Sequence, residues 1–222
     1  MCSSDLQFGV LASAVEESGG RPEIVFSDGR KQTFDRVIVC GGSDFQTLYP
    51  EILAGSGLVA CKLQMLAIDG SAADYCLGTH LASGLTLRHY RIFEVCQSLA
   101  KLRQRIAEET PELDEYGIHV MASQNNHGDL ILGDSHEYGN RIEPFDDVRI
   151  DEWILRELRT LLRLPSWQLS RRWHGIYAKH PELPVFQHEV RRGVHIFAGP
   201  GGSGMTMSFG LAEDFWNGID NG

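Results

Sequence analysis

The chain has 222 residues, a formal net charge of −10 and a hydrophobic content of 42%. This length allows one large domain or two small ones, and the apolar content is enough for a buried core. The acidic balance argues against nucleic acid or an anionic membrane as a partner. No apolar run approaches the roughly 18 residues of a membrane span. We therefore expect a cytoplasmic protein without a membrane span, and the sequence leaves its oligomeric state open.

The five cysteines are an odd number and include no C-x-x-C pair. Cys40, Cys61 and Cys96 lie among apolar or strand-like residues. We expect these three to be buried free thiols, as is usual in a reducing cytoplasm.

The N-terminal region is predicted to form a hairpin and then a parallel strand. Residues 23–27 and 32–34 flank an Asp-Gly turn between alternating sequences, which is typical of an antiparallel hairpin. Residues 37–40 form a short apolar run, typical of a parallel strand covered on both faces. The run ends at Gly41 and Gly42, which permit close approach of a ligand or another backbone.

The middle of the chain is predicted to be largely antiparallel. Residues 58–92 are rich in Leu, Thr, Tyr and Gly, and we expect several strands there, the clearest at 86–93. A helix is predicted at 98–109, where the apolar residues share one face and Pro111 ends the pattern.

Further strands are predicted near 119–122 and 130–132, around a polar turn, and a later strand at 171–177. A second helix is expected at 151–162, with Asp151 as its N-cap.

At the C-terminal end, a buried strand is predicted at 194–198, then a glycine-rich turn at 199–204 and a helix at 205–216. Such a turn presents backbone N–H groups and the positive end of a helix dipole, which favour a phosphate or the electron-rich edge of a reduced flavin. Only about twenty residues follow the turn, too few for the next strand of a nucleotide-binding βαβ unit. A turn over a flavin ring and a plain strand–turn–helix packed through its glycines both remain open.

A family resemblance is carried by four segments, at 34–42, 62–65, 172–181 and 199–204. Their sequence, order and spacing resemble the FAD-dependent amine and D-amino-acid oxidoreductases, which include glycine oxidase and sarcosine oxidase. The resemblance extends over the chain from about Gln7 onward. Residues 81–90 and 121–129 are most similar to a subgroup associated with organophosphonate catabolism.

The resemblance implies a mixed α/β fold, the C-terminal part of a Rossmann-like FAD-binding domain with an inserted antiparallel-sheet substrate domain. We expect a partial FAD-binding domain at 1–57, a substrate-binding domain at 58–180 and a return to the FAD-binding domain at 181–222. The family's Gly-x-Gly-x-x-Gly unit is not found, and residues 1–6 resemble a translated sequencing adapter. We therefore expect an N-terminally truncated fragment that is inactive alone and binds flavin weakly or not at all.

The resemblance also implies that FAD is bound non-covalently, because no cysteine lies near Gly175, where sarcosine oxidases attach their flavin. Backbone N–H groups of the C-terminal turn would stabilise the negative charge of the reduced ring. The residues that the resemblance places beside FAD are Gly41, Gly42, Gly201, Gly202, Ser203, Gly204, Met205 and Thr206. A packing role is the simpler alternative for the glycines.

Two carboxylate-binding positions of the family differ in this chain. Tyr177 stands where glycine and D-amino-acid oxidases carry an arginine, and Thr206 stands where sarcosine oxidases carry a lysine. The resemblance therefore disfavours a plain α-amino acid and favours a small aminophosphonate, whose dianionic group needs cationic donors.

The candidate donors are drawn from two regions of the chain. The substrate-binding residues that we expect are His89, Arg91, His174, Tyr177 and Lys179. Strand alternation would put His89 and Arg91 on one face of 86–93 and Arg88 and Tyr90 on the other, and the sequence leaves open which face lines the site. Surface salt bridges are the simpler alternative.

No metal site is expected, because no helical H-x-x-x-H pair and no cysteine–histidine group occurs. The function that follows is an FAD-dependent oxidoreductase that oxidises the C–N bond of a small amine by hydride transfer to flavin. Such chemistry depends on orientation more than on an acid or base, so the catalytic residues are left unassigned. The alternatives are a glycine-, sarcosine- or D-amino-acid-oxidase type of enzyme, and a non-catalytic fragment that cannot hold FAD.

Overall fold

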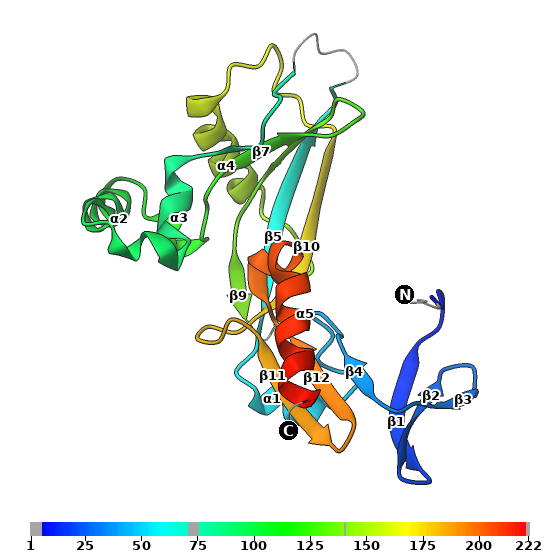
Figure 1. The fold of residues 1–222 in the computed structure, drawn as a ribbon. Coiled ribbons are helices and arrows are strands. Elements are labelled where there is room, and N and C mark those ends of the chain that lie inside the picture. The colour runs from blue at the N-terminus through cyan, green and yellow to red at the C-terminus, as the bar shows by residue number, and fades with distance from the viewer. Residues whose placement is uncertain (1–5, 71–75, 140, 221–222) are drawn as a thin grey trace. The chain divides into compact units, whose positions relative to one another are not determined.

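The computed structural model of the protein describes residues 6–70, 76–139 and 141–220, so the expectation for residues 1–6 lies almost wholly outside it. The chain divides into two compact units (Figure 1). Unit 1 combines Met1–Ala60 with Tyr177–Gly222, and unit 2 is Cys61–Ile176. The sequence predicted domain boundaries after residues 57 and 180, whereas the two units divide after residues 60 and 176. No helix among the described residues is long and apolar enough to cross a membrane.

Unit 1 contains two three-stranded sheets. The first is an antiparallel sheet of β1 (Ala12–Ser18), β2 (Arg21–Phe26) and β3 (Lys31–Thr33). The second has the order β11 (Phe186–Arg191), β12 (Val194–Ala198) and β4 (Val37–Val39). β11 and β12 are antiparallel, whereas β12 and β4 are parallel. The predicted hairpin and the predicted parallel strand are both confirmed.

The helices of unit 1 are α1 (Pro50–Gly55), the 3₁₀ turn η3 (Gly201–Ser203) and α5 (Gly204–Asp220). Figure 1 shows α5 beside β11 and β12, and its Phe215 ring packs on His195 and Phe197 of β12, each at 5.4 Å between centroids. The buried core of the unit is formed by Val15, Val37, Val39, Leu53, Leu58, Val194, Ile196 and Ala198. This packing fixes the C-terminal helix against the strand that precedes it.

Unit 2 is built on a six-stranded sheet. Its path is β10-β5-β8-β7-β6, and β9 pairs with β5. The strands are β5 (Val59–Ile68), β6 (Leu81–Ala82), β7 (Met121–Gln124), β8 (Leu130–Gly133), β9 (Glu137–Gly139) and β10 (Arg171–Lys179). The β5–β8, β8–β7 and β7–β6 pairings are all antiparallel, as predicted for this block.

The helices of unit 2 are η1 (Gly84–Arg88), η2 (Arg91–Val95), α2 (Ser98–Glu109), α3 (Glu112–Glu115) and α4 (Val148–Leu161). α2 has the predicted bounds. In α4, the buried residues Ile150, Ile154 and Leu158 recur every fourth position and so form one apolar face. That face contributes to the core of the unit with apolar residues of β5, β7 and β8.

The predicted cap of α4 was wrong. The N-cap is Asp147, whose carboxylate accepts a hydrogen bond from the Arg149 backbone N–H at 2.9 Å. Asp151 is buried one turn into the helix, where its carboxylate pairs with Arg172 at 2.7 Å. The helix therefore begins earlier than expected, because both aspartates satisfy the local preference for an acidic first turn.

The predicted strand at 86–93 was also wrong, since this segment forms parts of η1 and η2. Leu85 and Thr86 are both buried while Leu87 is 40% exposed. Adjacent residues on a strand point to opposite faces, so this burial suits tight 3₁₀ turns better than a half-buried strand. Local β-propensity was overridden by packing.

Of the three cysteines expected to be buried, only Cys61 is, whereas Cys40 and Cys96 are exposed. Cys40 comes directly after the end of β4, and Cys96 follows the last residue of η2. Both positions lie just outside a regular element, so neighbouring apolar residues did not indicate burial of the thiol.

Candidate functional site

Two glycine segments meet at one edge of a unit 1 sheet. β4 and β12 run parallel with Val37 opposite Val194 and Val39 opposite Ile196. Gly41 and Gly42 follow the first of these strands, and the turn from Gly199 follows the second. Because the carboxyl ends of parallel strands share an edge, both segments lie where ligands of α/β sheets usually bind. The structure thus brings the two sets of predicted FAD-contacting glycines to the same edge.

The C-terminal turn requires glycine at its start. Gly199 has φ +74°, and a Cβ there would lie 2.3 Å from Leu58 Cδ2. Gly201 has φ +62°, in the left-handed region that side chains disfavour. The turn is tied to the end of β10 by an antiparallel bridge between Lys179 and Pro200. These constraints fix the path of the backbone as it enters α5.

The predicted residues Ser203, Gly204, Met205 and Thr206 form the junction of η3 and the first turn of α5. η3 runs directly into α5, and the Gly204 N–H donates to the Gly201 carbonyl oxygen. The N–H groups without an intrahelical acceptor are therefore those at the start of η3, at the positive end of the dipole. The N-cap of η3, Pro200, provides no side-chain cap. Met205 is 95% exposed and Gly202 and Thr206 are also exposed, so this donor-rich end is open to a ligand.

Tyr177 and Lys179 lie beside the same turn. They are separated by one residue on β10, so their side chains share a face of that strand. A side chain starting at Gly202 would meet the Tyr177 hydroxyl oxygen at 3.9 Å, and one starting at Gly201 would meet Lys179 Cγ at 3.7 Å. The hydroxyl and the lysine stem therefore border the glycines that the resemblance assigns to FAD.

The remaining expected substrate residues, His89, Arg91 and His174, belong to unit 2. His89 caps the C-terminal end of η1 and the exposed Arg91 begins η2, so the strand alternation expected to pair them does not exist. His174, on β10, places Nδ1 2.8 Å from the Asp146 carboxylate. That carboxylate also lies 3.0 Å from the ammonium nitrogen of the buried Lys62, so His174 belongs to a charge network.

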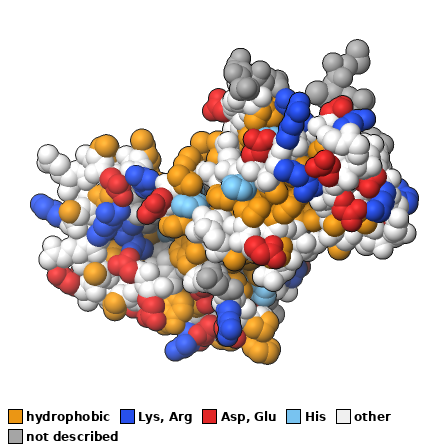
Figure 2. Space-filling model, turned by 90° about the horizontal axis from the view of Figure 1, so that it is seen from below, with side chains coloured by type: hydrophobic (Ala, Val, Ile, Leu, Met, Phe, Trp, Pro, Cys, Tyr) orange, Lys and Arg blue, Asp and Glu red, His pale blue; other side chains and the backbone are white. Residues whose placement is uncertain are grey.

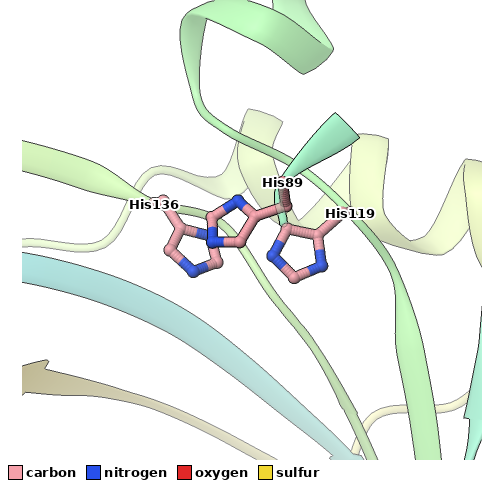
Figure 3. A group of neighbouring side chains, drawn as sticks. All are labelled: His89, His119 and His136. Atoms are coloured by element: carbon pink, nitrogen blue, oxygen red, sulfur yellow. The ribbon is translucent and has the colours of Figure 1, made fainter. Parts of the chain in front are cut away.

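The sequence analysis missed a cluster of three histidines in unit 2. His89, His119 and His136 gather side by side in Figure 3, with ring centroids 4.1 to 4.7 Å apart. His119 and His136 each come just before a strand of the sheet, β7 and β9. Their spacing in the chain matches no helical or short-loop motif, so only the fold reveals the cluster.

Asp134 completes the surroundings of this cluster. Its side chain lies with Oδ1 3.8 Å from His119 Nε2, and burial raises the pKa of this carboxyl to about 7.

On the surface of the protein, Figure 2 shows acidic and basic side chains interspersed on the visible face, so neither sign dominates that face.

The parallel pair with glycine turns at its carboxyl edge, together with an antiparallel sheet in a separate unit, defines a mixed α/β architecture. Residues 6–215 match the family described as DAO, FAD dependent oxidoreductase. The chain belongs to this family of FAD-dependent oxidoreductases. No curated protein matches the sequence.

Solved structures of several oxidoreductases share the fold. The glycine oxidase of Geobacillus kaustophilus is 12% identical, with a TM-score of 0.58 over 90% of this chain and 45% of that chain. The glycine oxidase of Bacillus cereus is 14% identical, with a TM-score of 0.60 over 90% and 46%. The glycerol-3-phosphate dehydrogenase of Bacillus halodurans, solved with FAD, is 16% identical, with a TM-score of 0.55 over 95% and 39%. The chain thus spans less than half the length of these proteins.

FAD is the cofactor of the family, and the residues present fit a flavin. The N–H groups at the start of η3, directly before α5, suit the part of the ring that gains negative charge on reduction. The absence of a side chain at the exposed Gly202 leaves room for close approach to that backbone. The second glycine pair, Gly41 and Gly42, leaves similar space at the neighbouring strand end, with Gly42 at φ +61°.

Proposed function

We propose that this chain is part of an FAD-dependent enzyme that oxidises the C–N bond of a small amine, with an aminophosphonate as substrate. The observation that carries the proposal is the placement of Tyr177 and Lys179 beside the glycine turn at the start of α5. A cation and a hydroxyl next to the flavin-type turn suit a small anionic amine. Bound FAD would supply the hydride acceptor for such a substrate.

The replaced carboxylate-binding positions of the family support a phosphonate over a carboxylate. The type of cation does not decide between them, because the planar fork of arginine matches carboxylate and phosphate groups alike and lysine acts as a point charge towards either. Here the family's arginine position holds Tyr177, and the charge beside the turn comes from Lys179. We infer that Lys179 binds the phosphonate and that Tyr177 hydrogen-bonds the substrate and orients its C–H bond.

Two alternative functions each have a supporting observation. A glycine- or sarcosine-type amino acid oxidase is favoured by the fold shared with glycine oxidases, although identities of 12% and 14% speak for the fold alone. A non-catalytic chain without flavin is favoured by the chain spanning under half of those structures.

The test uses the parent enzyme that contains this chain, loaded with FAD. It is mixed anaerobically with aminophosphonates, glycine, sarcosine or D-amino acids, and bleaching of the flavin absorbance is recorded. We expect bleaching by an aminophosphonate, and we expect Lys179→Met to raise the half-saturating concentration about tenfold or more, equivalent to roughly 1.4 kcal/mol. Lys101→Met, on the exposed surface of α2, is the matched control. Bleaching by amino acids alone supports the first alternative, and failure to bind FAD supports the second.

A further inference from the structure

The histidine cluster of unit 2 has the composition of a metal site. His89, His119 and His136 each offer one ring nitrogen, and these three atoms lie within 4.8 Å of one another. His119 and His136 are only 3% and 5% exposed, and His89 is half-buried. Three imidazoles gathered this closely form a familiar set of ligands for a transition metal.

Oxygen atoms lie behind two of the rings, as in known metal sites. His136 Nδ1 lies 3.1 Å from the Gly117 carbonyl oxygen, and donation of its N–H there leaves Nε2 as the ligand nitrogen. Asp134 Oδ1 lies 3.8 Å from His119 Nε2, so a small approach would let that nitrogen donate to it and leave Nδ1 as the ligand. A carbonyl or carboxylate hydrogen-bonded behind an imidazole fixes its tautomer and orientation and raises its affinity for a metal.

The burial of the Asp134 carboxylate also favours a cation nearby. It is 8% exposed, and its Oδ1 makes no hydrogen bond within the described part of the chain. A buried carboxylate oxygen without a partner is unfavourable unless a cation or a proton neutralises it. A divalent ion on the neighbouring histidines would supply that charge.

The cluster also has a route to solvent. A pocket of about 100 Å³ is lined in part by His89 and His119. Its other charged residues, Arg88 and Asp114, neutralise one another in an ion pair, and Arg88 also donates to the Ile118 carbonyl at 3.0 Å. An ion can therefore reach the rings without meeting an uncompensated positive charge, which is one requirement of a real site.

We propose that His89, His119 and His136 bind a zinc ion, with Asp134 as the carboxylate partner behind His119. Imidazole nitrogen favours zinc over calcium or magnesium, which prefer oxygen ligands. Nitrogens on one tetrahedral zinc ion lie about 3.4 Å apart, given Zn–N distances of about 2.0–2.1 Å. The rings must therefore close up on binding, and His89, at the end of the five-residue η1, is the one with room to turn. Three protein ligands leave a fourth position open to water or to an anion.

The test is calorimetric titration of the metal-free protein, without a polyhistidine tag, with zinc chloride. We expect one zinc ion per chain, a rise in melting temperature with zinc but not with magnesium, and a tetrahedral absorption spectrum when cobalt replaces zinc. His89→Ala, at the half-buried ring, should weaken zinc binding about 100-fold or more, and Asp134→Asn about 10- to 100-fold.

His127→Ala is the matched control, because His127 is exposed on the turn between β7 and β8 of the same unit. It should leave the titration unchanged. Circular dichroism of each variant establishes that it is folded, and His136→Asn provides a second ligand variant should His89→Ala unfold. Absence of stoichiometric zinc binding, or binding that both ligand variants retain, overturns the proposal. The titration needs no flavin, so its outcome is independent of the proposed oxidoreductase activity.

Discussion

Tyr177 on β10 and Gly202 in η3 face each other, with the tyrosine hydroxyl 3.9 Å from where a side chain at the glycine would begin. The two residues are far apart in the chain, and both belong to unit 1. Their proximity joins two segments to which the sequence resemblance assigns separate roles, one in substrate binding and one in flavin binding. The residue proposed to contact the substrate therefore lies beside the turn proposed to contact the flavin.

The two ends of the glycine turn should respond differently to a methyl group. Gly199→Ala combines a left-handed φ with a clash at Leu58, and we expect it to destabilise unit 1 by about 2–4 kcal/mol. Gly202→Ala has only an ordinary contact at 3.9 Å and should change the free energy of unfolding little, yet weaken FAD binding. Urea unfolding and flavin titration of both variants check this. Equal stability of the two variants would contradict the account of the turn.

Substitution of Tyr177 should alter substrate preference. Tyr177→Arg places a guanidinium where the resembling oxidases bind a carboxylate, so glycine and D-amino acids should bind more tightly relative to aminophosphonates. Flavin bleaching rates for the two substrate classes measure the change. Tyr177→Phe, which removes the hydroxyl but keeps the ring, is the control and should slow bleaching without reversing the preference. An unchanged preference in Tyr177→Arg would show that this residue does not contact the substrate.

Lys62 should be important for stability rather than for substrate binding. It is 1% exposed, and its ammonium donates to the carbonyls of Glu143 and Phe145 and pairs with Asp146. Lys62→Met leaves these acceptors without their cation, and the loss of one member of a buried ion pair costs about 3 kcal/mol or more. Lys101→Met, on the exposed face of α2, should change stability by less than about 0.5 kcal/mol. Thermal or urea unfolding separates the two.

The cap of α4 should show a defined pH dependence. Hydrogen bonds from the Arg149 side chain and backbone lower the pKa of Asp147 below its usual value. A lowered pKa means that the stabilisation is present above the pKa of the unfolded chain and is lost as the pH falls through the folded value. Asp147→Ala should therefore cost about 1 kcal/mol at neutral pH, with the difference from the unmodified protein shrinking towards pH 3. Urea unfolding at both pH values measures it, and a difference independent of pH would contradict the ionised cap.

Local sequence signals predicted the elements whose partners are near in the chain. Turn residues predicted the hairpin of β2 and β3, and apolar spacing predicted the helix α2. The glycines predicted the turn between β12 and α5. The apolar run of β4 predicted a parallel pairing, although its partner β12 lies more than a hundred residues later. In each case one short pattern carries the information.

The errors arose where burial depends on distant contacts. η1 and η2 have strand-like composition, but the burial of adjacent residues in η1 is set by packing within unit 2. The histidine cluster joins residues 89, 119 and 136, which no periodicity connects, and the rings meet only because β7 and β9 begin near the end of η1. Such sites depend on tertiary structure and leave no motif in the sequence.

The central claim is that a small amine passes a hydride to FAD and that water then hydrolyses the resulting imine to a carbonyl compound and a free amine. The most direct measurement is an anaerobic single turnover of the FAD-loaded parent enzyme that contains this chain with an aminophosphonate, in which flavin bleaching and carbonyl product are quantified together. We predict one carbonyl product for each flavin bleached, with Lys179→Met slowing both equally at low substrate concentration. Bleaching without a carbonyl product, or no bleaching by any amine in a protein that binds FAD, would contradict the account.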